Sequence, residues 1–190
     1  MSQPRVSVII PTHNRAALLP VAVESARRAG GEPEIVVVDD ASTDATPQVC
    51  RSLAGIRLVR LEKNVGLAAA RNAGIHASTG EFIALLDDDD QRLPDSLPPQ
   101  LEALQDNPEA AFCYGQILLG ENATGRWTGE VLPEKIFRGD IFWRLLRGNF
   151  IPGLTVVLRR EALLAAGLFD PRLRQVEDWD LWLRLAQFHP

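Results

Sequence analysis

Short runs of apolar residues alternate with polar, glycine-containing stretches along the first 115 residues. Four of these runs are rich in β-branched residues and predict strands, over residues 6–10, 34–38, 56–61 and 82–86. Between them, apolar residues recur at helical spacing over residues 18–28, 44–53 and 67–78. Strand–helix–strand repeated three times predicts an α/β fold with a doubly wound, mostly parallel sheet and helices on both faces. Nearly continuous apolar strands agree, since parallel strands are covered on both sides.

The pattern continues beyond residue 96 and changes after residue 114. We expect a helix over 97–105, a strand over 111–114, and a loop or hairpin in the polar stretch 120–129. Apolar residues at helical spacing then predict a helix over 134–146. A short strand over 155–158 and helices over 160–166 and 178–188 complete the chain. No repeat or linker interrupts it, so we expect one domain over 1–190.

Composition narrows the function classes only slightly. The chain has 190 residues, a net charge of −5 and a pI near 5.2, which argues against a nucleic-acid partner. Its two cysteines form no metal-binding pair and no disulfide framework. No apolar run approaches the roughly 20 residues that span a bilayer. We therefore expect a cytoplasmic protein, and leave open its oligomeric state and peripheral association with the inner face of a membrane.

The strongest chemical signal is the run of four aspartates, Asp87 to Asp90, directly after the apolar run 82–86. Two carboxylates 4 Å apart repel by roughly 4 kcal/mol at an effective dielectric of about 20. Such a cluster favours a bound cation, and Mg²⁺ often takes one or two carboxylates together with substrate phosphates. The alternative is a solvated turn that caps the next helix, but a cap needs only one carboxylate.

Two further polar clusters follow predicted strands, at residues 11–15 and 39–44. In open parallel sheets, ligands bind beyond the carboxyl ends of the strands, so all three clusters predict one site. Each has a structural alternative: Asn14 as a turn or cap residue, Asp40 as a turn aspartate, and Asp44 as a helix cap. No GxGxxG, GxxxxGK[ST] or GxSxG motif is present, so metal must carry more of the phosphate recognition.

A third acidic group lies near the end of the chain, at residues 177–180. Acidic side chains in the first turn of a helix suit the positive end of the helix dipole, which is the structural interpretation. The functional interpretation is a general base that takes a proton from a hydroxyl within hydrogen-bond reach.

These clusters, in this order, resemble the family-2 inverting glycosyltransferases. The matching stretches are VSVIIPTHNR (6–15), IVVVDDASTD (35–44), NVGLAAARNAG (64–74), GEFIALLDDDDQRLPD (80–95) and VEDWDLWLRLA (176–186). The resemblance implies a GT-A-type, Rossmann-like fold with a nucleotide-sugar-binding half (1–115) and an acceptor-binding half that carries the catalytic base (116–190). It also implies a nucleoside diphosphate sugar donor, with a UDP-sugar as first guess, and Mn²⁺ or Mg²⁺. The acceptor would be a carbohydrate or glycolipid, in polysaccharide or glycoconjugate synthesis.

The resemblance also implies roles for individual residues. Those implied for the donor are Pro11, Thr12, His13, Asn14, Asp40, Arg71, Asp87 and Asp88, where His13 stands at a place that is often tyrosine in the family. Asp89 would be the metal ligand. Asp178 would be the catalytic base, with Glu177 and Asp180 as rivals. The acceptor candidates are Asn149, Trp179 and Glu177. Structural alternatives are a surface ion pair for Arg71 and a core position for Trp182.

Sugar transfer by this arrangement would be a single displacement that inverts the anomeric carbon. A non-catalytic nucleotide-sugar-binding relative is the alternative from another class. A phospho-acceptor signalling domain also places acids at strand ends, but it needs a lysine after a late strand. Arg159 and Arg160 stand at that place.

Overall fold

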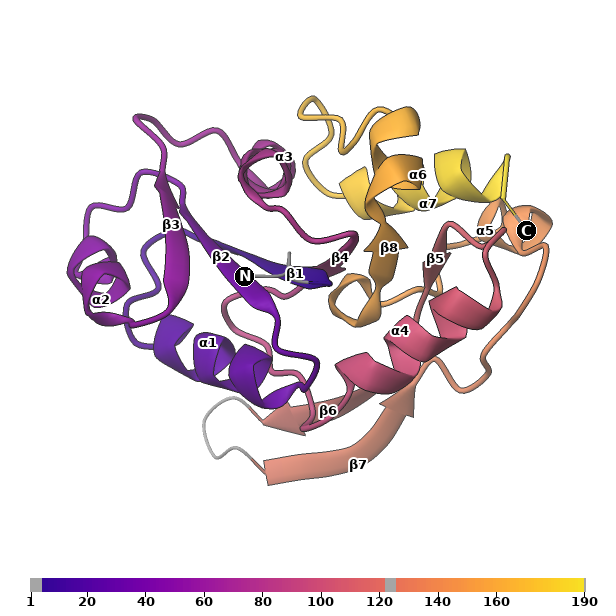
Figure 1. The fold of residues 1–190 in the computed structure, drawn as a ribbon, viewed down its shortest axis with the longest axis horizontal. Helices are drawn as coiled ribbons and strands as arrows, with labels where there is room; N and C mark the ends of the chain where they lie inside the picture. The colour runs from indigo at the N-terminus through magenta and orange to yellow at the C-terminus, as the bar shows by residue number, and fades with distance from the viewer. Residues whose placement is uncertain (1–4, 122–125, 190) are drawn as a thin grey trace.

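The computed structural model describes residues 5–121 and 126–189, and its centre is a six-stranded sheet (Figure 1). Its strands follow the order β3-β2-β1-β4-β8-β5. They are β1 (Val6–Thr12), β2 (Glu34–Asp39), β3 (Ile56–Arg60), β4 (Phe82–Leu85), β5 (Phe112–Cys113) and β8 (Val157–Arg159). The first four in spatial order are parallel, whereas β8 runs antiparallel to both β4 and β5. The predicted mostly parallel sheet is confirmed.

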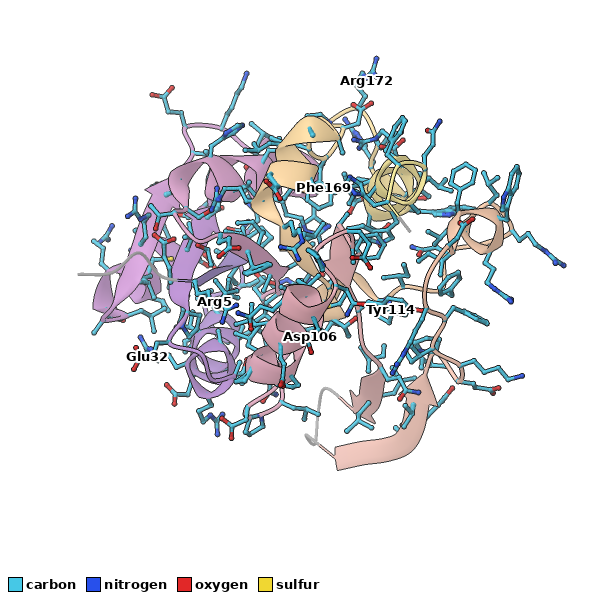
Figure 2. All side chains as sticks on the ribbon, turned by 45° about the vertical axis from the view of Figure 1, so that its right-hand side comes forward. Arg5, Glu32, Asp106, Tyr114, Phe169 and Arg172 are labelled. Atoms are coloured by element: carbon cyan, nitrogen blue, oxygen red, sulfur yellow. The ribbon has the colours of Figure 1, made fainter. Side chains whose placement is uncertain are left out.

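Helices cover both faces of this sheet (Figure 1). One face carries α1 (Leu19–Arg28), α2 (Thr46–Ser52) and α4 (Leu97–Asp106). The other carries α3 (Leu67–Ala77), α5 (Phe142–Leu145), α6 (Arg160–Ala165) and α7 (Glu177–Ala186). Successive side chains of β1 point to opposite faces of the sheet: Val8 and Ile10 pack against the first set of helices, and Ile9 packs against the second. Phe169 is buried in the second layer, while Arg172 projects outward (Figure 2).

A small second sheet lies beside α4. It is the antiparallel pair β6 (Ile117–Glu121) and β7 (Arg126–Leu132), so the hairpin alternative for residues 120–129 is confirmed. The connecting residues 122–125 lie outside the described part. No described helix combines the length and the hydropathy that a bilayer crossing requires.

The predicted helix over 134–146 is wrong. Only α5 is helical there, and Gly139 adopts a φ of 69°, a left-handed conformation that glycine tolerates and that interrupts a helix. The Asp140 carboxylate then accepts the N–H of Phe142 (3.1 Å) at the start of α5. Upstream, the N–H of Phe137 donates to the Tyr114 hydroxyl (2.8 Å) rather than to a helical carbonyl.

The strand predicted over 155–158 begins two residues later than expected. Gly153–Thr155 form a single turn of 3₁₀ helix, η1, and β8 follows it. The hydroxyl of Thr155 donates to the carbonyl of Pro152 (2.8 Å), which stabilises this turn. The η1 turn therefore lies next to the carboxyl end of β4, where the acidic run begins.

Candidate functional site

The carboxyl ends of β1, β2 and β4 meet at one edge of the sheet, as predicted. The closest polar contact across this edge joins the cluster 11–15 to the four aspartates, since the Thr12 hydroxyl donates to Asp88 Oδ2 at 2.6 Å. Such short bonds are typical of a hydroxyl that faces an ionised carboxylate. Thr12 and Pro11 are both buried, so they shape the floor of this edge.

The loop after β1 is tied to the loop after β2. Asn14 has a φ of 56°, and its Oδ1 accepts the N–H groups of Thr43 (2.8 Å) and Asp44 (3.2 Å). His13 is exposed, and its Nδ1 lies 2.7 Å from the carbonyl oxygen of Asp40. Asn14 thus performs the turn role that was its structural alternative, while the exposed His13 ring stays available to a ligand.

The aspartates at the end of β2, Asp39 and Asp40, are buried and hydrogen-bonded. Asp40 Oδ1 accepts the N–H of Val65 (2.8 Å), and Oδ2 accepts that of Gly66 (2.9 Å). Asp39 lies between the N–H of Ser42 (2.9 Å) and the guanidinium of Arg60 (3.3 Å). Asp40 therefore holds the chain segment that leads into α3, and a ligand donor would add to these two bonds rather than replace them.

Asp44 also has a structural contact. Its Oδ1 accepts the N–H of Thr46 (2.8 Å) at the start of α2. This bond satisfies one of the free N–H groups of the helix, which is the capping role that was its alternative.

The four aspartates form a tight bend, which we call the acidic turn (Asp87–Asp90). The N–H of Asp90 donates to the carbonyl of Asp87 (3.1 Å). Burial raises the pKa of Asp88. Burial also raises the pKa of Asp90 to about 6, with further increases from Asp87, Asp89 and Asp88. Asp89 is the most open member, with 41% of its side chain exposed and Arg15 Nη1 3.5 Å away.

The acidic turn fits a divalent cation that takes few protein ligands. Among the described residues, no three His, Cys, Asp or Glu side chains converge to enclose a metal ion by themselves. The donor set is nevertheless all carboxylate oxygen, which suits Mg²⁺ or Mn²⁺. Because two of the four pKa values are raised by burial and mutual repulsion, a cation at this turn would relieve an existing electrostatic strain.

Arg71 connects the acidic turn to α7. Its side chain is only 5% exposed, so it is not the surface ion pair that was its alternative. Nη2 donates to Asp87 Oδ1 (2.8 Å) and Nη1 donates to Glu177 Oε1 (3.1 Å). The guanidinium carbon also lies 5.4 Å from the centre of the Phe169 ring.

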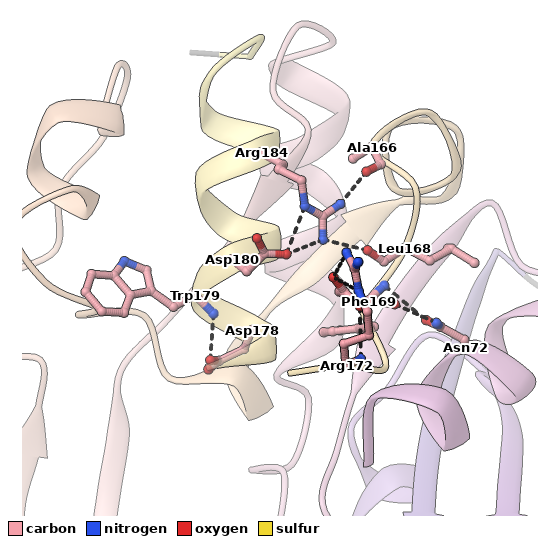
Figure 3. A network of polar contacts seen from close by, with 10 residues as sticks. Asn72, Ala166, Leu168, Phe169, Arg172, Asp178, Trp179, Asp180 and Arg184 are labelled. Carbon is pink, nitrogen blue, oxygen red and sulfur yellow. Dashed lines mark hydrogen bonds and ion pairs between the residues drawn. The ribbon is translucent and has the colours of Figure 1, made fainter. Parts of the chain in front are cut away.

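The three acids in the first turn of α7 have different partners. Glu177 is buried against Arg71, and Asp180 pairs with Arg184 at 2.7 Å. Asp178 accepts from Asn149 Nδ2 at Oδ2 (3.3 Å) and takes part in none of the ion pairs between described residues. Figure 3 shows Asp180 directed at Arg184, with Asp178 at the start of the helix and Trp179 on the opposite side. Of the three acids, Asp178 is therefore the one without a cationic partner.

The structure brings Asn149 to Asp178 but gives Trp179 a packing role. The indole N–H of Trp179 donates to the carbonyl of Leu145 (2.8 Å), which attaches α7 to the end of α5. Trp182 is fully buried, so its predicted core position is confirmed.

A cavity of about 750 Å³ opens beside the acidic turn. Asp88–Asp90 form one wall, and most of the rest is apolar, including Leu18, Leu93 and Leu118. Gly153 of η1 would place a Cβ 3.7 Å from Asp178 Oδ2, and the next residue, Leu154, lines the cavity. One loop therefore separates the cavity from the candidate base.

Sequence reasoning gave no role to Arg15, although it belongs to the predicted cluster 11–15, and it missed Arg92 altogether. Arg15 approaches Asp89, and the buried Arg92 donates to the carbonyls of Leu85 (3.3 Å) and Leu154 (3.1 Å), next to the acidic turn. Burial lowers the pKa of Arg92 to about 10. For Arg92 the only signal was its place two residues after four aspartates, and a pattern of that kind does not reveal burial.

Comparisons with known proteins agree with this geometry. The family model described as "Glycosyl transferase family 2" matches residues 7–165. The Bacillus subtilis protein TuaG, whose name assigns it to teichuronic acid biosynthesis, is 31% identical over 190 residues, which are 97% of this chain and 73% of that protein. This chain spans only part of such relatives, for example 62% of an uncharacterized glycosyltransferase of Haemophilus influenzae and 26% of one from Rickettsia bellii.

Two solved structures have the same fold. The Pyrobaculum calidifontis mannosyltransferase PcManGT, solved with GDP-Man and Mn²⁺, superposes with a TM-score of 0.73 at 24% identity. That match covers 100% of this chain and 54% of the other. Residues 1–349 of S. aureus TarS, solved with UDP-GlcNAc, give a TM-score of 0.66 at 23% identity, over 97% of this chain and 53% of the other.

Proposed function

Because this chain belongs to glycosyl transferase family 2, we propose that it is the metal-dependent, inverting glycosyltransferase domain of its protein. It would transfer a sugar from a nucleoside diphosphate sugar to the hydroxyl of a carbohydrate or glycolipid acceptor. The observation that carries the proposal is that Arg71 connects the acidic turn, through Asp87, to Glu177, the residue before Asp178. Asp178 itself has no cationic partner among the described residues.

The donor would lie across the carboxyl ends of β1, β2 and β4. The exposed His13 would contact the nucleotide base, with Pro11, Thr12, Asn14 and Asp40 shaping the pocket around it. Asp87 and Asp88 would border the ribose and diphosphate, and Asp89 would be the metal ligand. A divalent cation bound there would neutralise the negative charge that develops on the leaving diphosphate.

The acceptor hydroxyl would approach from the side of α7 and η1. Asp178 would accept its proton as the oxygen attacks, while Asn149 orients the carboxylate through the bond to Oδ2. Attack opposite the leaving group inverts the anomeric carbon in one displacement and needs no enzyme nucleophile. The role of the 116–190 half in acceptor binding remains part of this proposal.

The nucleotide base and the biological setting are less constrained. The two structural neighbours were solved with a uridine and a guanosine sugar nucleotide, so both bases deserve testing, with a UDP-sugar first. The name of TuaG supports polysaccharide or glycoconjugate synthesis as the setting. A cytoplasmic location stays a prediction.

The test is release of nucleoside diphosphate from sugar nucleotides with Mn²⁺ or Mg²⁺ and a panel of hydroxyl acceptors. We expect metal-dependent turnover that Asp89→Ala and Asp178→Asn abolish. Asp106→Asn, which removes an exposed carboxylate at the end of α4, should retain it. Donor binding without release by the wild type, across the acceptor panel, would instead support the non-catalytic nucleotide-sugar-binding alternative.

A further inference from the structure

Three charged residues connect the two parts of the candidate site, and we call them the arginine link (Asp87, Arg71 and Glu177). Asp87 begins the acidic turn, and Glu177 directly precedes Asp178 in α7. Arg71, from α3, donates to Asp87 at 2.8 Å and to Glu177 at 3.1 Å. The link therefore spans residues that are 90 positions apart in the chain and that border the candidate metal ligand and the candidate base.

The geometry leaves Arg71 and Glu177 little room to bind substrate. The side chains of Arg71 and Glu177 are 5% and 9% exposed, and both terminal nitrogens of Arg71 already donate to carboxylates. The remaining nitrogen, Nε, is buried and has no hydrogen-bond partner in the part of the chain that the structure describes. Buried ion pairs gain little stability over apolar residues of the same size, so stability alone is a poor reason for this arrangement.

The neighbouring residue strengthens the attachment of α3 to the segment that leads into α7. Asn72 Nδ2 donates to the carbonyl of Phe169 (2.8 Å), and its Oδ1 accepts the N–H of the same residue (3.1 Å). The ring of Phe169 in turn lies against the Arg71 guanidinium. One helix thus fixes both the approach to α7 and its first turn.

We propose that Glu177 and Arg71 are positioning residues that hold Asp178 at a set distance from the acidic turn. This inference rests on the proposed function, and it assigns to Glu177 a role other than acceptor contact or rival base. Displacement of a reacting group by about 1 Å is enough to lower a rate about 10²-fold. Loss of the link should therefore lower turnover far more than it lowers donor affinity.

The kinetic test compares Glu177→Gln and Glu177→Ala with Arg184→Gln. The control removes an arginine that also attaches α7, through Asp180 and the carbonyl of Leu168, but about two turns further along the helix. We expect the Glu177 variants to lose about 10- to 100-fold in kcat, with the KM for the donor within about twofold. The glutamine variant keeps the shape of the side chain and removes only the charge that pairs with Arg71, so it protects the test against a misfolded alanine variant. A raised KM with unchanged kcat, or an equal loss in Arg184→Gln, would overturn the proposal.

A second measurement does not depend on activity. Amide hydrogen exchange should become faster at 86–90 as well as at 176–180 in the Glu177 variants, because the link couples these segments. In Arg184→Gln, faster exchange should stay within α7 and the 166–168 segment. Unchanged exchange at 86–90 in the Glu177 variants would reject the link. A wild type that transfers no sugar would reject the proposed function while leaving this exchange result interpretable.

Discussion

The acidic turn and the first turn of α7 contain similar densities of carboxylates, but they differ in how the charge is balanced. On α7, Glu177 faces Arg71, Asp180 faces Arg184, and Asp178 faces the amide of Asn149. In the acidic turn, burial and mutual repulsion raise the pKa values of Asp88 and Asp90. Acid density alone therefore does not identify a cation site. The acidic turn is short of positive charge, because Asp87 has Arg71 and Asp89 has a more distant Arg15, while Asp88 and Asp90 take part in none of the ion pairs between described residues.

The largest expected effect is on turnover, and it distinguishes Asp178, which has no cationic partner among the described residues, from the other acids of α7. Asp178→Asn keeps the shape of the side chain but cannot accept a proton, so kcat should fall by about 10²- to 10⁴-fold. Affinity for Mn²⁺ and nucleotide should be unchanged, because these belong to the acidic turn in our proposal. Steady-state kinetics and calorimetric titration measure the two quantities. Full activity of this variant would remove Asp178 from the reaction.

A bound metal ion should stabilise the protein through the acidic turn, and this stabilisation should not depend on the acids of α7. At about 100 times its Kd, Mn²⁺ with a nucleoside diphosphate should add about 2.7 kcal/mol to the free energy of unfolding, or roughly 5–10 °C in Tm. Asp89→Ala should lose this shift, while Asp180→Asn should keep it. Thermal denaturation with and without chelator is the measurement. Equal shifts in both variants would place the metal elsewhere.

Removing the charge of Asp90, and with it the repulsion from the other aspartates of the acidic turn, should stabilise the metal-free protein. The folded state raises the pKa of Asp90 from 3.8 to about 6, so between these values it holds a proton that the unfolded chain has released. Ionisation of Asp90 therefore lowers stability as pH rises through this window. Asp90→Asn should gain about 1–2 kcal/mol at pH 8, after allowance for solvent screening, and the gain should shrink as pH falls from 6 toward 4. Urea denaturation in the presence of chelator, at pH 8 and at pH 4, measures this gain, with Asp106→Asn as the unchanged control.

The smallest effect concerns the paired acids of α7. Asp180 and Arg184 are partly exposed and four residues apart on the same helix, so the pair should contribute about 0.3–0.5 kcal/mol. Asp180→Asn should lower the free energy of unfolding by no more than this, and high salt should reduce the difference. A loss of several kcal/mol would mean that this pair contributes far more than an exposed ion pair on a helix.

The fold of the first half followed from the sequence because its signals are local. A buried parallel strand is a continuous apolar run, and the charge that follows β4 marks where burial ends. The helix predicted over 134–146 failed because periodicity counts apolar positions without registering the left-handed Gly139, or that Phe137 bonds to Tyr114. Beyond β5, tertiary contacts decide the local structure.

The site was predictable in outline but not in its connections. Thr12 meeting Asp88 follows from strand topology, since β1 and β4 are neighbours. The partnership of Arg71 with Glu177 joins residues 106 positions apart and leaves no periodic trace in one sequence. The same holds for Asn14, whose role depends on which loop packs beside it.

One position with no side-chain chemistry limits how far this domain can vary. Gly74 lies where α3 crosses the sheet, and a Cβ there would be 2.5 Å from Ile9 Cγ2 and 2.9 Å from Val38 Cγ2. A single methyl group would push the helix outward and carry Arg71 with it, three residues away on the same helix. Substitutions at Gly74 should thus disturb the candidate site from a distance, at a position that no inspection of reactive groups would single out.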